Sequence, residues 1–423
     1  MKTTPFWTED FPRPAHLPTH PLPTHVDVAV IGGGYTGLNA ARVLAQNNTT
    51  VAVLERHTIG WGASSRNGGM ATVGLKAPIK TVFQQYGETL GHTFWQASLE
   101  AIDLIDQIVQ TEKIDCHFER CGHVELAYKP SHFAEMKNAI TWYKKTLNHQ
   151  SAYLLAPNEM SQEIGSEAYF GGLADTFSAG LHPAQYVYGL AQAVARHGAF
   201  LCENADVQRL EKLASGYRLH TSQGVITAKE ILIATNGYTD QLVPALKPQV
   251  FPVGSYIIVT DPLPPDQQQK LSPKGRMFFD SKHFLNYFRL TPDGRMLFGG
   301  RNNLSTNLDL HDSAQRLQQR MVEVFPDLAG IPITHSWTGQ LGITFDLMPH
   351  AGYKNGLHYA FGYGGHGVAI ATYLGTEMGL ILAGKKQSTP FAEIKQQTMF
   401  FYRNRPWFLP FAAWYYRFLD WIS

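Results

Sequence analysis

The stretch VDVAVIGGGYTGLNAARVLAQNNTTVAVLE, residues 26–55, decides the fold of this chain. Its pattern predicts a strand over Val26–Ile31, a helix over Leu38–Ala45 and a second strand over Val51–Leu54 that ends in Glu55. The turn between the first strand and the helix matches G-x-G-x-x-G. A strand, a glycine turn, a helix and a second strand that ends in an acid form the βαβ unit that binds a dinucleotide.

The residue types in this unit follow from that binding. Gly32 permits the tight turn, Gly34 lets the backbone approach a pyrophosphate, and Gly37 lets the helix pack on the strand. The phosphates then face free N–H groups at the start of the helix, where the partial positive charge favours an anion. Glu55 can accept hydrogen bonds from a ribose diol. The candidate cofactor residues of this unit are Gly32, Gly34, Tyr35, Thr36, Gly37, Glu55 and Arg56.

The composition describes a large folded protein with little net charge. At 423 residues the chain should form two or three structural units. The formal net charge of +1 gives no electrostatic basis for binding nucleic acid. Cys116, Cys121 and Cys202 form no C-x-x-C pair, so they predict neither a disulfide framework nor a zinc site, and they suit a reducing compartment.

The N-terminal arm, residues 1–24, is broken by prolines and lacks the apolar segment of a signal peptide. A cytoplasmic protein is therefore expected. His16, His20 and His25 lie in or beside this arm, but no paired carboxylate or helical spacing accompanies them. We expect a solvated, proline-rich arm and no bound metal.

A polar, glycine-rich loop, GWGASSRNGG over Gly60–Gly69, follows the second strand. It leaves the sheet at the carboxyl ends of the strands, where open α/β folds bind ligands. Another turn of this kind, Asn236-Gly237, follows the apolar strand predicted over Ile226–Thr235. The candidate cofactor residues here are Ala63, Ser64, Ser65, Arg66, Asn67, Gly68, Gly69, Thr235, Asn236 and Gly237.

A change of periodicity after Val250 predicts a second domain on a mixed or antiparallel sheet. Strands are expected over Leu285–Leu290 and Met296–Gly300, and Thr291–Gly294 (TPDG) between them has the residues of a hairpin turn. The fold class is therefore α/β, or α+β overall, with a Rossmann-like cofactor-binding domain beside the second domain. The predicted division is 1–24 as the arm, 25–80, 150–245 and 330–385 as the cofactor-binding domain, 81–149 and 246–329 as the substrate domain, and 386–423 as an aromatic tail.

The last apolar strand, Leu357–Gly362, is followed by the turn GYGGHG and a helix over Val368–Leu382. This turn is a second G-x-G-x-x-G match, but no strand ending in an acid follows the helix, so a second nucleotide site is rejected. The helix start near His366 can instead aim its N–H groups at a site that gains negative charge.

The chain ends in an aromatic tail, residues 398–423. Its charged residues, which exclude a transmembrane helix, include Arg403, Arg405, Arg417 and Asp420. The aromatic residues that suit one face of a helix are Trp414, Tyr415, Phe418 and Trp421. That face can lie in a membrane interface, or it can dock on the body of the protein or on a second subunit.

Together these motifs resemble those of the FAD-dependent oxidoreductases of the D-amino-acid-oxidase and sarcosine-oxidase type. The resemblance covers residues 25–385, and GWGASSRNGG and GYGGHGVA are most similar to the γ-glutamylputrescine oxidase branch. It implies that FAD is the cofactor. It also implies noncovalent binding, because no cysteine stands where sarcosine oxidases attach their flavin.

The resemblance also implies where the parts of FAD lie. The pyrophosphate would lie at the first glycine turn, the adenosine ribose at Glu55 and the adenine at the backbone of Val207, while Ser64–Gly69 would run beside the pyrophosphate and flavin. The second glycine turn would place helix N–H groups at the flavin C2 carbonyl, where they stabilise the negative charge left by hydride transfer to N5. The candidate residues of that turn are Gly364, Gly365, His366, Gly367 and Val368.

The chain departs from this family where relatives bind an α-carboxylate. Relatives resembling glycine oxidase carry an Arg before a T-x-D-x-x-P segment, and here Leu341 precedes Thr344–Pro349, while a second family Arg falls at Gly365. Sarcosine oxidases place a Lys two residues beyond G-H-G, where this chain has Ala369. The resemblance therefore implies that the substrate is a primary or secondary amine without a carboxylate on the oxidised carbon.

Three residues are candidates for catalysis or substrate contact. His366 can act as a general base, or it can serve only the backbone of its turn. Tyr287 and Arg289, on one face of a predicted strand, can contact substrate, or they can be ordinary solvated strand residues.

Three functions remain open from the sequence. The first is an amine oxidase that passes electrons to O2 and makes H2O2. The second is a dehydrogenase that passes electrons to a membrane quinone, with the aromatic tail as its membrane contact. The third is a nonredox flavin-binding protein.

Overall fold

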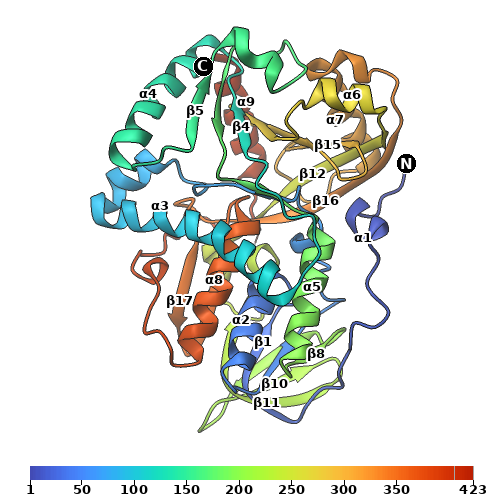
Figure 1. Cartoon of the computed structure of the whole chain (residues 1–423). Helices are drawn as coiled ribbons and strands as arrows, with labels where there is room; N and C mark the ends of the chain where they lie inside the picture. The colour runs from blue at the N-terminus through green and yellow to red at the C-terminus, as the bar shows by residue number, and fades with distance from the viewer. Residues whose placement is uncertain (404, 423) are drawn as a thin grey trace.

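The computed structural model describes residues 1–403 and 405–422, with side chains up to residue 420. In this part of the chain, two eight-stranded sheets form the two halves of the molecule, the first below and the second above in Figure 1. The first sheet has the order β17 (His350–Lys354), β18 (Leu357–Phe361), β11 (Gly224–Ile233), β1 (His25–Ile31), β2 (Val51–Leu54) and β8 (Phe200–Cys202), and β9 (Val207–Lys212) and β10 (Tyr217–Thr221) join it beside β11.

The second sheet and the helices complete the architecture. The order of the second sheet is β16 (Ile333–Ile343), β12 (Phe251–Pro262), β15 (Arg295–Gly300), β14 (Asn286–Leu290), β13 (Met277–Asp280), β4 (His123–Leu126), β6 (Gly172–Asp175) and β5 (Ala152–Leu155), and β3 (Met70–Ala71) pairs with β7 (Ala179–Gly180). The α-helices are α1 (Phe6–Asp10), α2 (Tyr35–Gln46), α3 (Ile79–Glu112), α4 (Pro130–Thr146), α5 (Pro183–Arg196), α6 (Pro265–Leu271), α7 (Leu310–Val324), α8 (Gly367–Leu382) and α9 (Leu409–Ile422).

The βαβ unit predicted from residues 26–55 is confirmed. β1 pairs in parallel with both β2 and β11. Alternate residues of β1 and β2 point to opposite faces: Val28 and Val53 pack under α2, α5 and α8, whereas Ala29 and Leu54 belong to the core on the other face. Strands covered on both faces are apolar throughout, which is why these segments can be recognised in the sequence.

Two small residues bring α8 against α2. A Cβ at Gly375 would lie 2.4 Å from the carbonyl oxygen of Thr36, and one at Gly379 would lie 2.8 Å from that of Ala40. No side chain fits at either position, so the two helices pack backbone to backbone. This close packing sets the middle of α8 beside the start of α2, although the two are far apart in the sequence.

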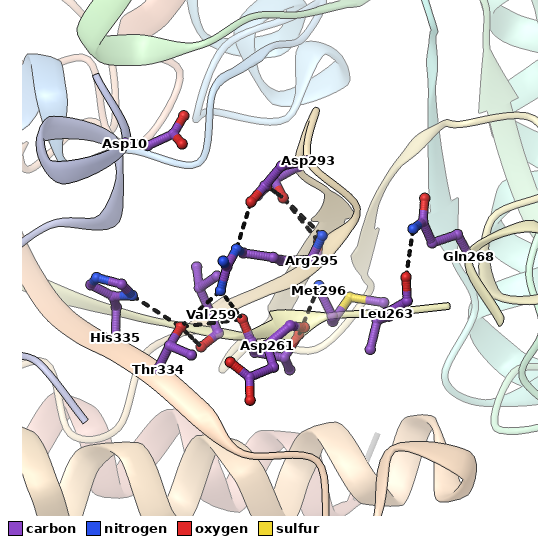
Figure 2. Close-up of polar contacts among 12 residues, drawn as sticks. Asp10, Val259, Asp261, Leu263, Gln268, Asp293, Arg295, Met296, Thr334 and His335 are labelled. Carbon is purple, nitrogen blue, oxygen red and sulfur yellow. Dashed lines mark hydrogen bonds and ion pairs between the residues drawn. The ribbon is translucent and has the colours of Figure 1, made fainter. Parts of the chain in front are cut away.

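The second sheet is mixed, as predicted. β12, β14, β15 and β16 are antiparallel neighbours, whereas β4 and β13 are parallel. The predicted hairpin joins β14 to β15, with Gly294 at φ +81°. Arg295 beside this turn donates to Asp293 (2.6 Å) and to the carbonyl of Thr260 (3.0 Å), as Figure 2 shows for the Asp293 contact. These contacts fix the hairpin against β12.

The predicted division into domains needs a correction in three strands. β5, β6 and β16 lie in the second sheet, although their residues were assigned to the cofactor-binding domain through the ranges 150–245 and 330–385. The residues of a strand carry no local signal for the sheet in which it pairs, because pairing depends on partners far away in the sequence.

The prediction of a solvated N-terminal arm is wrong. Phe6 and Trp7 of α1 and Leu17 are buried in the main core. Asp10 pairs with His182 (3.1 Å), and His335 of β16, which Figure 2 draws on the same side of the sheet as Asp10, contacts Glu9 (3.2 Å). The prolines do interrupt regular structure, but the two aromatic rings at the start of the arm anchor it to the body.

The aromatic tail docks on the body of the protein, which was one of the predicted alternatives. Tyr402, Leu409 and Ala413 are buried in a cluster with Phe251 and Ile343 of the second sheet. Other rings remain exposed, and they are Phe400, Trp407, Phe411, Trp414, Tyr415 and Phe418. The side chain of Trp421 lies outside the described residues. Among the described helices, none is both long and apolar enough to cross a bilayer.

Candidate active site

A cavity opens at the carboxyl ends of the parallel strands, where Ile31 ends β1, Leu54 ends β2 and Ile233 ends β11. Most of the predicted cofactor residues line it: Gly32, Gly34, Tyr35, Thr36, Glu55, Arg56, Ala63, Ser64, Asn67, Val207, Thr235, Asn236, Gly364, Gly365, Gly367 and Val368. The predicted residues outside its lining are Gly37, Ser65, Arg66, Gly68, Gly69, Gly237 and His366. Segments from four separate parts of the sequence therefore meet at one site.

The first glycine turn is closed by contacts that only glycine permits. Gly32 has φ +113°, and a Cβ there would lie 2.7 Å from the carbonyl oxygen of Ala234. A Cβ at Gly37 would lie 2.0 Å from the carbonyl oxygen of Gly32, so Gly37 supports the turn without lining the cavity. The N-cap residue of α2, Gly34, has no side chain to cap the helix, and both Gly34 and Tyr35 line the cavity. The positive end of this helix therefore faces the cavity and favours an anion.

Glu55 is held in place by two backbone N–H groups. Its carboxylate accepts from Gly33 (2.7 Å) and from His57 (2.9 Å). Each carboxylate oxygen keeps a further acceptor position, which a diol in the cavity can use. Beside it, Arg56 pairs with Asp206 and Asp240 at 2.6 Å each, so its charge is neutralised within the protein.

The glycine-rich loop 60–69 is organised by Asn67. The Asn67 amide donates to the carbonyls of Ala63 and Ser64 (3.0 Å each), and its oxygen accepts from the N–H of Gly69 (2.8 Å). Ser64 in turn accepts from the N–H of Tyr35 (3.0 Å), at the start of α2. The loop thus contributes to the wall of the anion site itself.

Three side chains from distant segments hold this loop from outside. Trp7 donates its indole N–H to the carbonyl of Asn67 (2.8 Å), and Trp337 of β16 donates to that of Arg66 (3.0 Å). Arg289 of β14 donates to the carbonyl of Gly69 (2.8 Å). Arg289 lines no part of the cavity and belongs to this framework. Trp7 and Trp337 were not predicted, because nothing in the local sequence marks a tryptophan as a donor to a remote loop.

The turns at Asn236 and Gly362 are joined to each other. The Asn236 side-chain oxygen accepts from the N–H of Gly362 (2.9 Å), and a Cβ at Gly237 would lie 2.9 Å from the nitrogen of Gly342. Gly237 therefore serves close packing, while Thr235 and Asn236 reach the cavity.

The start of α8 presents backbone rather than side chains to the cavity. Its N-cap residue, His366, makes no capping hydrogen bond, and Gly365, Gly367 and Val368 line the cavity. A Cβ at Gly365 would have nothing within 4 Å, so the backbone here faces open space. The positive end of a second helix is thus aimed at the same cavity.

The candidates for catalysis lie beside the cavity. Burial, together with Lys76, His123 and Arg301, lowers the pKa of His366 to about 3, so its imidazole is neutral, and its Nδ1 has no partner among the described residues. Burial raises the pKa of Tyr287 to about 12, and its hydroxyl is paired with Ser255 at 3.0 Å.

Tyr287 packs on the edge of the glycine-rich loop. A Cβ at Gly68 would lie 3.2 Å from its ring. Its ring therefore lies under the loop and close to the cavity, although the residue is not part of the lining. A role for Tyr287 or His366 in contact with substrate stays a prediction.

The positions where relatives were expected to bind an α-carboxylate carry no charge here. Leu341 lines the cavity, next to the tail cluster in which it is partly buried. Gly365 lines the cavity without a side chain, and Ala369 is buried.

The comparison with known proteins identifies the family. Residues 27–379 match the family model "FAD dependent oxidoreductase" (DAO). The chain belongs to this family. The "Probable oxidoreductase OrdL" of Haemophilus influenzae is 33% identical over 83% of this chain and 81% of its own length. The "Gamma-glutamylputrescine oxidoreductase" of Escherichia coli is 31% identical over 85% of this chain and 84% of its own length.

A solved structure confirms the fold. The structure of glycine oxidase from Geobacillus kaustophilus superposes with a TM-score of 0.75 at 22% identity, covering 89% of this chain and all of that one. The protein is therefore an FAD-dependent oxidoreductase with the mixed two-sheet fold of this family.

The residues present fit FAD. The positive end of α2, the extended backbone at Gly34 and the carboxylate of Glu55 offer a pyrophosphate site and a ribose site in the expected order. None of the three cysteines lines the cavity, and Cys116 and Cys202 are buried. These features suit FAD that is held without a covalent bond to sulfur.

Proposed function

We propose that the protein oxidises the C–N bond of a primary or secondary amine whose oxidised carbon carries no carboxylate, and that O2 receives the electrons. A γ-glutamylputrescine-like compound is the model substrate. The observation that carries this proposal is the uncharged cavity wall at Leu341 and Gly365. A carboxylate buried there without a partner carries a penalty of several kcal/mol. The name of the Escherichia coli relative supports the same class of substrate.

The protein's own groups prepare the site for this reaction. Bound FAD supplies the acceptor for the hydride that leaves the carbon of the C–N bond. The uncapped start of α8 presents N–H groups to the cavity, and they favour negative charge there without any rearrangement.

The overall balance is that of an oxidase. A primary amine, O2 and water give an aldehyde, ammonia and H2O2, and a secondary amine releases a smaller amine in place of ammonia. The imidazole of His366 lies beside the cavity and is neutral, but a pKa of about 3 makes it a weak proton acceptor at neutral pH, so this shift disfavours a general-base role.

A quinone-reducing dehydrogenase is the second candidate. The exposed rings of the tail, among them Trp407, Phe411 and Trp414, favour it because aromatic side chains are common at membrane interfaces. The same rings can also cover a second subunit. Peroxide formation at the rate of amine consumption supports the oxidase, whereas turnover only with a dye or quinone supports the dehydrogenase.

The test is a screen of amines for bleaching of the flavin without oxygen. Putrescine and γ-glutamylputrescine are compared with glycine, sarcosine and D-alanine. We expect the first group to be preferred by about 100-fold or more in kcat/KM, since an unpaired carboxylate costs several kcal/mol and 1.4 kcal/mol is a factor of ten. Bleaching by the amino acids alone would refute the proposal. Failure of every compound would favour a nonredox flavin-binding protein.

A further inference from the structure

An aromatic surface stays exposed where the tail docks on the second sheet. The inner side of α9 is buried, because Leu409 and Ala413 join Tyr402 and Phe251 in one apolar cluster. The outer side carries what we call the aromatic patch, which consists of Phe400, Trp407, Phe411, Trp414, Tyr415 and Phe418. The last four of these residues are spaced three, four and seven positions apart from the first of them, so they share one face of α9.

The rings of the patch are large, strongly exposed and in contact with one another. Phe400 is 94% exposed, Trp414 is 70% exposed and Phe411 is 69% exposed. The ring centroids of Trp407 and Phe411 lie 6.3 Å apart, and Trp414 stacks on Phe418 at 6.0 Å. Single exposed apolar residues are ordinary, but a group of neighbouring large rings marks a surface that another molecule covers.

Polar contacts hold α9 with this face outward. Lys129 donates to the carbonyl of Asp420 at 2.9 Å. The Asp420 carboxylate accepts from the backbone N–H groups of His283 (2.7 Å) and Phe284 (3.0 Å). Arg417 donates to a backbone carbonyl at the end of β15. These contacts, together with the buried inner side, prevent the helix from turning its exposed rings toward the body.

The charges beside the patch are positive. Arg403 and Arg405 are exposed, and neither forms an ion pair or a side-chain hydrogen bond with a described residue. Within residues 398–403 and 405–420 the only acid is Asp420, whose carboxylate faces the body. The tail therefore presents aromatic rings and unpaired positive charge on the same surface.

We propose that the aromatic patch, with Arg403 and Arg405, binds the surface of an anionic lipid bilayer. Tryptophan and tyrosine join an apolar ring to a polar group, and they are enriched where hydrocarbon meets the headgroups. Arginines at the same level attract anionic headgroups. A helix that lies in the interface, with its other face on the protein, needs no membrane-spanning length. The inference does not rest on amine oxidation, because a protein held at a bilayer can pass electrons to O2 or to a quinone.

A second copy of the chain is the competing occupant. In a two-fold dimer the same patch faces itself. Arg403 and Arg405 would then meet the equally cationic surface of the other copy, and the described tail offers no free carboxylate to pair with them. Like charges brought together weaken an interface. Charge complementarity therefore favours the anionic bilayer.

The binding test uses FAD-loaded, full-length protein and two kinds of vesicle. One consists of phosphatidylcholine, and the other of phosphatidylcholine and phosphatidylglycerol in equal parts. We expect the protein to sediment with the mixed vesicles and to bind them about 5- to 30-fold more tightly than the neutral ones, as for one or two arginines near an anionic surface. High salt should remove this preference, because it screens exposed charges.

Four variants separate the rings from the charges. Phe411→Ser and Trp414→Ser each remove one exposed ring, and serine has a helix propensity close to those of phenylalanine and tryptophan. Each should lower the affinity for the mixed vesicles about 5- to 100-fold, as for withdrawal of one large apolar side chain from the interface. Arg403→Gln and Arg405→Gln should each lower it about fivefold and weaken its dependence on salt.

The matched controls lie in the first sheet. Tyr353→Ser removes an exposed ring of β17, and Lys212→Gln removes an exposed charge of β9. Both should bind the mixed vesicles as the wild type does. Flavin content and circular dichroism check that every variant is folded.

The outcomes decide between the two occupants. Failure to bind the mixed vesicles, equal binding to both kinds of vesicle, or full binding by the two serine variants of α9 would overturn the proposal. A dimer in analytical ultracentrifugation that Trp414→Ser dissociates, in a protein that binds no vesicles, would assign the patch to a second copy. None of these results depends on whether an amine bleaches the flavin, so the proposed function is tested separately.

Discussion

At the scale of single residues, Gly34 tests the phosphate site most directly. Its backbone is extended (φ −95°, ψ −169°), so a valine fits there without strain. A Cβ would nevertheless lie 2.8 Å from the Ser64 hydroxyl, which accepts from the N–H of Tyr35. We expect Gly34→Val to yield folded apoprotein and Gly34→Ala to bind FAD more weakly. Flavin content and circular dichroism of the purified variants measure this, and normal flavin in the valine variant would refute the assignment.

At the scale of elements, the glycine-rich loop depends on segments that the sequence places far from it. Trp7→Phe and Trp337→Phe keep an aromatic ring but leave the carbonyls of Asn67 and Arg66 without their donors. An unsatisfied buried carbonyl costs about 1–3 kcal/mol. We expect each variant to raise Kd for FAD by about 5- to 100-fold. Trp407→Phe is the matched control, because Trp407 is exposed and remote from the loop.

The tail is an element of the folded body, so its removal should have a cost in stability. Truncation after Gln397 removes Tyr402, Leu409 and Ala413 from their cluster and exposes Phe251. Each large buried apolar side chain contributes about 1.5–3 kcal/mol. We expect a lower Tm, measured by thermal unfolding, with FAD still bound because none of the described tail residues lines the cavity.

The same truncation tests the membrane contact. If the exposed rings hold the protein at a bilayer, the full chain should pellet with lipid vesicles and the truncated chain should not. Equal pelleting of the two would exclude the tail as the membrane contact.

At the scale of the whole molecule, the sequence predicts what depends on neighbouring residues. The turn at Gly32, the acid at Glu55 and the helix between them form one continuous segment, so their periodicity and spacing are sufficient. Sheet membership of β16 and the anchoring of the glycine-rich loop by Trp7 and Trp337 depend on contacts between distant segments. No local pattern encodes those contacts.

The cavity also joins the two halves of the molecule, which leads to the last prediction. Its lining includes Ile31 of β1 and Val368 of α8 from the first half, and Gln340 and Leu341 of β16 from the second. FAD that binds only the folded state stabilises it by RT ln(1 + [FAD]/Kd), about 2.7 kcal/mol at 100 times Kd. Because no cysteine lies in the lining, this stabilisation should be reversible. FAD should therefore stay in the supernatant after acid precipitation of the protein. Adding FAD to the apoprotein should raise Tm, and the rise should follow the logarithm of the FAD concentration. Yellow colour that stays in the acid pellet would contradict noncovalent binding, and a Tm unaffected by FAD would contradict a cofactor shared by both halves.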